Sequence, residues 1–332
     1  MNRAEKRRQR KLTGRTANKG PRKKFGGTQQ ALELAIQHYT AGDLPEAEDV
    51  CRDILQTDPN QPVALQMLGV IALQSGKNDI AAKYIQKAIE TNPGDADGHS
   101  NLGLALQNLG RLEESAASYR KAIDIRPGFA EAHNNLGNTL TQLGRLEEAV
   151  IHFQKAIQIN PNNANEHNNL GNTLKDLGEF DEALASYRKA IQLKPDFAEA
   201  HSNLGNLCSD LQRLDEAVVH IQKAIILRPD YADAHNNLGV VLQKLGRLEE
   251  SVDSFHKAIA IKPDYADAHN NLAGTLKELG RLEDSVDSYH KAIDINPELA
   301  DAHNNLGNVL KDLGQFSKAK AAYDRGFHIN HG

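Results

Sequence analysis

A period of 34 residues runs through most of the chain and limits its fold more than any other feature. Eight of the eleven prolines follow one another at this interval, from Pro59 to Pro297. Two glycine series, which include Gly103 and Gly110, keep the same interval. Self-similarity at a fixed period of about 20–50 residues is the signature of stacked repeats. The period predicts a tail at 1–27 and repeats at 28–61, 62–95, 96–129, 130–163, 164–197, 198–231, 232–265, 266–299 and 300–332.

Each repeat contains two helical patterns, and the fourth repeat shows them clearly. Leu136, Leu140 and Leu143 lie at positions i, i+4 and i+7, which predicts an amphipathic first helix. Gly144 suits the left-handed position that ends this helix. A second apolar pattern follows until Pro161, which prevents its continuation. Because one helical hairpin cannot bury both apolar stripes but stacked hairpins can, we predict an all-α fold, an α-solenoid.

Three local features predict details of the turns. Gln212 stands where the other repeats carry glycine, so it must accept an unfavourable φ or reshape its turn. Pro45 lies near the start of a second helix, where proline is tolerated. Asp196, Asp230 and Asp264 directly follow their prolines and are predicted to cap the next first helix.

The period, with Leu-Gly in the first helix, Ala in the second and Pro after it, resembles the tetratricopeptide repeat. The resemblance covers residues 28–332 and implies a right-handed superhelix of about nine helix-turn-helix repeats. His133 and Leu140 depart from the family pattern, which often has Trp and Tyr at these places. In the fourth repeat the residues that match the family's signature are Leu136, Gly137, Ala149, Phe153, Ala156 and Pro161.

A polar stripe accompanies the apolar one on each first helix. In the fourth repeat it comprises Glu131, Asn135, Asn138 and Gln142, at spacings of +4, +3 and +4. Its central member is asparagine in seven consecutive repeats, although asparagine is a mediocre helix former. These seven residues, here called the Asn ladder, are Asn101, Asn135, Asn169, Asn203, Asn237, Asn271 and Asn305. A second row of the stripe contains Asn138, Asn172, Asn206 and Asn308.

The chemistry of the Asn ladder suggests a function. A carboxamide donates and accepts hydrogen bonds, so it can bracket a peptide unit of a bound chain. Helices pack about 8–10 Å apart and an extended chain rises about 3.3 Å per residue. The ladder would therefore contact about every third residue of a ligand and bind its backbone.

The resemblance extends this hypothesis. In the tetratricopeptide family this face lines the concave groove, and the ladder is similar to that of O-linked N-acetylglucosamine transferases, where it holds acceptor polypeptides. The chain lacks the Lys and Arg with which family members clamp the C-terminal carboxylates of chaperones. We therefore expect a neutral or basic extended segment as ligand. The alternative is that the asparagines of a recently duplicated unit only keep the surface soluble or cap neighbouring groups.

The sequence predicts no catalytic, cofactor or metal site. Seven histidines recur at the repeat interval, about 10 Å apart, which is too far for one shared zinc ion, so they are predicted to pack structurally. Cys51 and Cys208 fall on core-facing positions and are predicted to be buried and unbridged. No P-loop, dinucleotide fingerprint, nucleophile elbow or HExxH motif occurs. Catalysis needs one unique constellation, whereas nearly every polar residue here is repeated, so a non-enzymatic scaffold is predicted. The seven histidines are His99, His133, His167, His201, His235, His269 and His303.

The tail differs chemically from the repeats. Residues 1–30 carry eleven Lys and Arg against the single acid Glu5, although the net charge of the chain is −5. Residues 1–27 have almost no apolar side chains and are predicted to be disordered. Weak contact with nucleic acid or an anionic surface, driven by counterion release, is a further hypothesis. Its candidate residues are Lys6, Arg7, Arg8, Arg10, Lys11, Arg22, Lys23 and Lys24.

Other features concern location and assembly. No apolar run approaches the ~18 residues of a membrane helix, and no secretory h-region follows the N-terminus. With only two cysteines, the sequence predicts a cytoplasmic protein without a membrane span. The last repeat lacks a polar cap, which predicts a homo-oligomer, a covering partner or a chain shortened from a longer parent.

We therefore predict a non-enzymatic scaffold that binds extended peptide segments in its Asn-rich groove. Two alternatives stay open at this point. One is a module that recruits substrates for a glycosyltransferase acting in trans, whose catalytic domain this chain lacks. The other is a nucleic-acid-associated adaptor that acts through the basic tail.

Overall fold

The computed structural model describes residues 27–331, so the basic residues proposed to bind polyanions lie outside the described residues. Within residues 27–331 the chain forms 18 α-helices and no strand, which confirms the predicted all-α solenoid. None of these helices has the length and apolar character needed to cross a bilayer. The chain divides into two compact units, unit 1 at residues 1–111 and unit 2 at residues 112–332.

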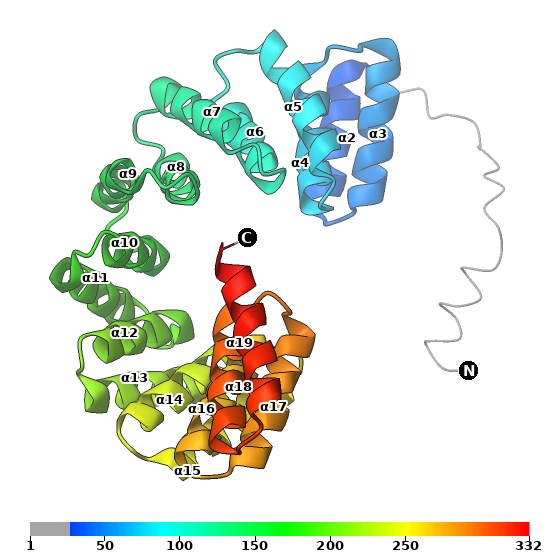
Figure 1. Ribbon diagram of the computed structural model, residues 1–332. Helices are drawn as coiled ribbons and strands as arrows, with labels where there is room; N and C mark the ends of the chain where they lie inside the picture. The colour runs from blue at the N-terminus through cyan, green and yellow to red at the C-terminus, as the bar shows by residue number, and fades with distance from the viewer. Residues whose placement is uncertain (1–26, 332) are drawn as a thin grey trace, which may run out of the picture. The chain divides into compact units, whose positions relative to one another are not determined.

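The described part of unit 1, residues 27–111, contains five helices that pack in chain order (Figure 1). Helix α4 also contacts α6, so the first helices of neighbouring repeats approach one another. Pro45 lies in the first turn of α3, as the sequence predicted. The bounds are α2 Thr28–Thr40, α3 Leu44–Thr57, α4 Pro62–Gln74, α5 Asn78–Thr91 and α6 Ala96–Asn108.

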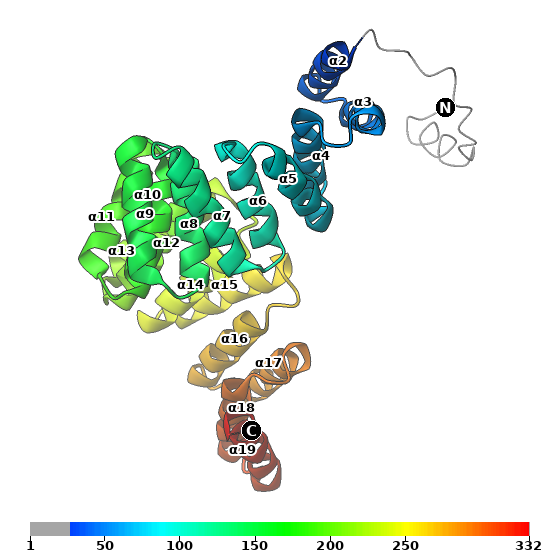
Figure 2. The same cartoon turned by 90° about the horizontal axis from the view of Figure 1, so that it is seen from above.

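Unit 2 continues the same arrangement from α7 to α19. Each helix contacts the next, and each even-numbered helix from α8 to α16 also contacts the following even-numbered helix. Figure 1 shows the even-numbered helices α8 to α14 on the inner side of the curve and the odd-numbered helices on the outer side. Figure 2 shows α16 to α19 continuing the stack in chain order. The bounds are α7 Leu112–Ile125, α8 Ala130–Gln142, α9 Leu146–Ile159, α10 Ala164–Asp176, α11 Phe180–Leu193, α12 Ala198–Asp210, α13 Leu214–Leu227, α14 Ala232–Lys244, α15 Leu248–Ile261, α16 Ala266–Glu278, α17 Leu282–Ile295, α18 Ala300–Asp312 and α19 Phe316–His331.

The two helices of a repeat approach closely where a glycine faces a large side chain. Phe153 on α9 is buried against Gly137 on α8, where an added Cβ would lie 2.8 Å from the ring. Tyr187 on α11 faces Gly171 in the same way, at 2.7 Å. These glycines are therefore required by the spacing of the helices, since a Cβ at such a distance would force the neighbour to move.

The turns between the two helices of a repeat are left-handed at one residue. Gly144 has a φ of 73°, as predicted for the residue that ends α8. Gln212 keeps the same turn with a φ of 59°, and it is the one non-glycine residue with positive φ among residues 27–331. The amide of Arg213 donates to the carbonyl of Cys208, as the amide of Arg145 does to that of Leu140. Gln212 therefore accepts the unfavourable φ and leaves the turn unchanged.

The predicted aspartate caps are wrong. Asp196, Asp230 and Asp264 lie one residue before the N-cap position, so their carboxylates cap no helix. The N-cap of α14 is Tyr231, which makes no side-chain capping bond. Its ring lies under the guanidinium of Arg228, with 3.7 Å between Cζ and the ring centre, and the equivalent aromatic residues of three other turns are also covered by cations.

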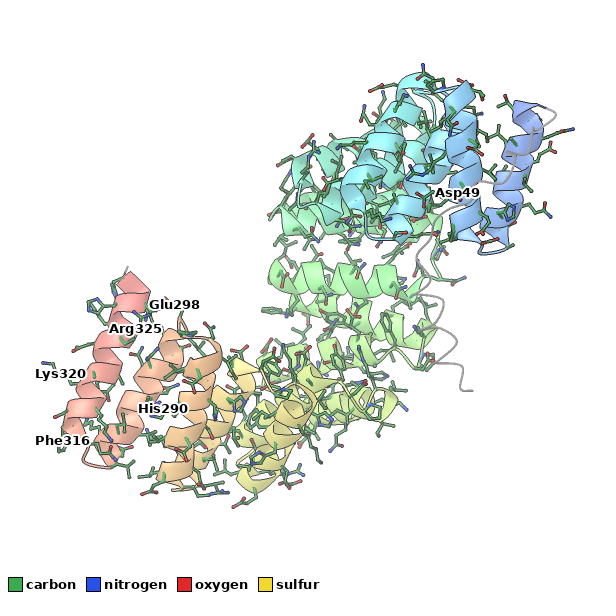
Figure 3. The ribbon with its side chains drawn as sticks, turned by 90° about the vertical axis from the view of Figure 1, so that its right-hand side faces the viewer. Asp49, His290, Glu298, Phe316, Lys320 and Arg325 are labelled. Carbon is green, nitrogen blue, oxygen red and sulfur yellow. The ribbon has the colours of Figure 1, made fainter. Side chains whose placement is uncertain are left out.

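The last helix, α19, carries both polar and apolar exposed groups. Arg325 donates to Glu298 over 2.8 Å, and the two residues are labelled close together in Figure 3. Phe316 and Phe327 are exposed on the same helix. Self-association through this end stays a prediction.

Candidate functional site

The Asn ladder lies on the even-numbered helices of both units. Asn101 belongs to α6 of unit 1, and the other six residues belong to α8, α10, α12, α14, α16 and α18 of unit 2. All seven side chains are half-buried. Helices α8, α10, α12 and α14, which carry Asn135, Asn169, Asn203 and Asn237, lie on the inner side of the curve of unit 2 (Figure 1).

Three ladder residues donate a hydrogen bond to the preceding repeat. The acceptor in each bond is the residue just before the ladder position, and these acceptors are here called the acceptor row. One proton of each donating amide is thereby fixed, which holds the side chain in one orientation. The bonds run from Asn169 Nδ2 to Asn134 Oδ1 at 3.2 Å, from Asn203 Nδ2 to Asn168 Oδ1 at 3.1 Å and from Asn271 Nδ2 to Asn236 Oδ1 at 3.1 Å.

The orienting bonds leave other polar atoms of the ladder available. No hydrogen bond within residues 27–331 engages the side-chain oxygen of Asn169 or Asn203. The amide of Asn237 has no side-chain partner in the same part of the chain. A half-buried carboxamide with a free oxygen and a free N–H can accept from and donate to one peptide unit.

The second row is positioned differently from repeat to repeat. Asn172 Oδ1 accepts from the hydroxyl of Tyr187 at 2.8 Å and from Asn203 at 3.0 Å. Asn308 Oδ1 accepts from the hydroxyl of Tyr323 at 2.9 Å. Where the core residue is Phe or Ile instead of Tyr, this donor is missing. The sequence analysis did not identify the tyrosines or the acceptor row as parts of the site, although both repeat at the same 34-residue interval.

Carboxylates flank the Asn ladder on the inner helices. Glu131, Asp233 and Asp301 lie exposed in the first turns of α8, α14 and α18. Asp176 and Asp210 end α10 and α12 and are exposed as well. Both edges of the stripe therefore carry carboxylates, with Lys244 at the C-terminal edge on α14.

The seven repeated histidines hold the turns between repeats. The Nε2 atom of each lies 3.0–3.3 Å from the carbonyl of the proline six residues earlier, and a carbonyl only accepts, so the histidine donates. This confirms the predicted structural role. Among residues 27–331 no three His, Cys, Asp or Glu side chains gather where a metal ion could bind.

The two cysteines are buried and unbridged, as predicted. Burial raises the pKa of the Cys51 and Cys208 thiols to about 11. A thiol with such a pKa is a poor nucleophile at neutral pH.

Two of the seven repeated histidines, His133 and His201, face a second histidine on the other helix of the same repeat. The Nδ1 atoms of His133 and His152 are 3.0 Å apart, and those of His201 and His220 are 3.2 Å apart. Because His133 and His201 use Nε2–H for the proline carbonyl, their Nδ1 atoms accept from the partner ring. If the accepting Nδ1 atom also took up a proton, two N–H groups would face each other with no acceptor between them. Burial lowers the pKa of all four rings, and burial and His133 together lower that of His152 to about 4.

The His pairs predict a loss of stability in acid. The unfolded chain takes up protons at these rings near pH 6.5, whereas folded His152 takes one up only near pH 4. The unfolded state therefore binds more protons in this window, and the free energy of unfolding falls as the pH decreases through it. Replacing His152 and His220 by serine, the residue of most other repeats, should flatten this dependence. Chemical denaturation followed by circular dichroism measures the free energy of unfolding at pH 7.5 and 5. If its difference between the two pH values is the same in the native chain and the serine variant, the His pairs do not cause the pH dependence.

Comparison with protein families places repeat matches along most of the chain. A model described as TPR repeat matches residues 137–178, 171–212, 205–246 and 275–314. Models described as Tetratricopeptide repeat match residues 29–53, 67–129, 118–151, 232–265 and 300–330. No curated protein sequence matches the chain.

Solved structures resemble the fold. The APC/C hetero-tetramer Cut9-Hcn1 matches with 17% identity and a TM-score of 0.62, over 86% of this chain and 57% of that chain, so this chain spans little more than half its length. YrrB, described as a TPR protein with an unusual peptide-binding site, matches with 30% identity and a TM-score of 0.47, over 57% of this chain and 97% of that chain. MamA matches with 23% identity and a TM-score of 0.45, over 49% of this chain and 95% of that chain.

Proposed function

The chain belongs to the tetratricopeptide repeat family, a scaffold suited to protein–protein interaction, and from this premise we propose that the Asn ladder of unit 2 binds extended polypeptide segments. The observation that carries the proposal is the set of hydrogen bonds between repeats. They orient the ladder amides of Asn169 and Asn203 and leave their oxygens without a partner in residues 27–331.

Orientation by the protein lowers the cost of binding. A freely rotating asparagine loses side-chain entropy when it captures a ligand, whereas an amide already held by its neighbour loses little. The oxygens accept backbone N–H groups of the ligand. The second amide proton of Asn169 meets a ligand carbonyl, whereas Asn203 contributes its oxygen alone, because its amide already donates to Asn168 and Asn172. This recognition is independent of ligand sequence, and the flanking carboxylates add a preference for basic segments.

The same bonds allow the asparagines both to connect neighbouring repeats and to bind a ligand. The acceptor row ties consecutive repeats together, and the ladder amide uses one proton for that purpose. The oxygen and the second amide proton of Asn169 remain for a ligand, and Asn203 keeps its oxygen. One residue type therefore serves both the packing of the solenoid and its groove.

The test uses an unstructured, fluorescein-labelled peptide of repeated Gly-Ser-Lys, because the ladder is proposed to read the backbone. Its dissociation constant is measured by fluorescence anisotropy on the full chain and on a variant with Asn169→Ala, Asn203→Ala and Asn237→Ala. We expect the triple variant to bind the peptide about tenfold more weakly than the native chain, or weaker still, since each lost hydrogen bond contributes about 0.5–1.5 kcal/mol.

Two controls separate binding from folding. Asn169→Ala and Asn203→Ala each leave an acceptor-row oxygen unpaired and so affect stability, whereas Asn237 makes no such bond, and Asn237→Ala alone should weaken binding at unchanged stability. Asn160→Ala with Asn162→Ala changes exposed asparagines of a turn and should leave binding unchanged. Equal affinity of the triple variant and the native chain, or no binding by the native chain, would show that the ladder does not bind peptides.

A further inference from the structure

The polar stripe becomes apolar in the second repeat, on α4 of unit 1. Met67 occupies the ladder position, and Val63 and Val70 occupy the flanking positions that hold Glu and Asn in the fourth repeat. Val63 is 43% exposed. On α2 and α6, Ile36 and Leu104 occupy the position equivalent to Val70 and are 44% and 37% exposed. The stripe on the even-numbered helices of unit 1 therefore differs chemically from the ladder of unit 2.

A cavity of about 340 Å³ opens on this face. Val63, Met67 and Val70 form much of its wall, and Tyr39 from α2 closes one side. The hydroxyl of Tyr39 accepts a hydrogen bond from Gln74 Nε2 at 2.7 Å, which fixes the ring against α4. The cavity has the size and the apolar lining that suit a bulky side chain.

Gln66 gives the cavity a polar anchor. It stands in the acceptor row, where Asn134 and Asn168 receive an N–H from the next repeat. The Oε1 atom of Gln66 is buried and has no hydrogen-bond partner within residues 27–331. Buried acceptors are nearly always satisfied, so this oxygen points to a donor that residues 27–331 do not supply.

The charge of the lining indicates the ligand's flanking residues. Asp95, at the start of α6, is half-buried and lines the cavity. No Lys or Arg of the described residues lines it. A carboxylate at the rim of an apolar cavity favours a cation beside the inserted side chain.

We propose that this cavity binds a protein partner through one bulky aliphatic or aromatic side chain with a neighbouring Lys or Arg. The apolar side chain fills the space between Tyr39, Met67 and Val70, and the cation lies against Asp95. A backbone N–H of the segment donates to Gln66 Oε1 once the side chain turns this oxygen into the cavity. The site lies wholly in unit 1 and stands whether or not the ladder of unit 2 binds peptides.

The test compares fluorescein-labelled Gly-Ser peptides with a central Lys-Leu-Lys, Lys-Ala-Lys or Glu-Leu-Glu on the full chain. We expect the Lys-Leu-Lys peptide to bind at least about tenfold more tightly than either of the others. The variant with Met67→Asn and Val70→Asn carries the residues of the fourth repeat and should bind the Leu and Ala peptides equally. Val63→Lys changes an exposed position, so it should weaken binding of the Lys-Leu-Lys peptide without affecting folding.

The ratio of the affinities for the Lys-Leu-Lys and Lys-Ala-Lys peptides tests binding in the cavity. Weaker binding of both peptides by the triple Asn→Ala variant tests the ladder. The two proposals therefore fail independently. Equal affinities on the native chain, including no binding of any peptide at millimolar concentration, would overturn the cavity proposal. So would a change of sedimentation between the native chain and the Met67→Asn, Val70→Asn variant, because it would assign the cavity to a second copy of the chain.

Discussion

Replacing Phe153 by alanine should lower the free energy of unfolding of unit 2 by about 3–5 kcal/mol. The ring is 1% exposed and belongs to the largest buried cluster of the described part of the unit, which extends from α7 to α14. Removing it takes away apolar burial and leaves a cavity that the rigid helix pairs cannot fill by collapse. Because each repeat contacts only its neighbours, the loss should be concentrated in α8 to α10.

Chemical denaturation followed by circular dichroism measures the loss, and hydrogen exchange locates it along the chain. Ile151→Ala is the matched control, since Ile151 lies on the same helix and is 63% exposed. This control should change stability by less than about 0.5 kcal/mol. Equal effects of the two variants would mean that Phe153 is not a core residue in solution.

Replacing Gly137 by valine should destabilise unit 2 by about 2–3 kcal/mol. The new Cβ would lie 2.8 Å from the ring of Phe153, and the two γ-methyl groups need still more room between α8 and α9. A better helix propensity than glycine offsets only a few tenths of a kcal/mol of this cost. The same denaturation experiment measures the result.

Asn138→Val is the control for this prediction, because Val240 occupies the equivalent position on α14 without disturbing the fold. A second comparison uses the first repeat, where Ala35 takes the place of the glycine and Cys51 that of the aromatic ring. Gly137→Ala combined with Phe153→Cys should therefore lose less stability than the sum of the two single changes. Strict additivity would contradict a steric coupling between these positions.

Asn169 and Met67 show which features of the site a repeat pattern can predict and which it cannot. Both residues occupy the same place in their repeats, and the sequence predicted the polar row from its periodicity. Which atoms of the row stay available depends on a bond between residues 35 positions apart, such as that from Asn169 to Asn134. No spacing within one repeat reveals such a bond. The cavity around Met67 could not be predicted from the repeat pattern, because it depends on residues in which the second repeat differs from the others and on Tyr39 of the first repeat.

The sequence by itself determined the helix pairs, the left-handed turn at Gly144, and the burial of Cys51 and Cys208, whereas it left open whether Gln212 would keep or reshape its turn. These features follow from local periodicity and local backbone sterics, which act within a few residues of the chain. Only the tertiary structure decided which amide atoms of the Asn ladder are engaged and where Gln66 remains unpaired. The physical reason is that a hydrogen bond depends on distances of about 3 Å between groups from different helices, and those distances arise only when the repeats stack.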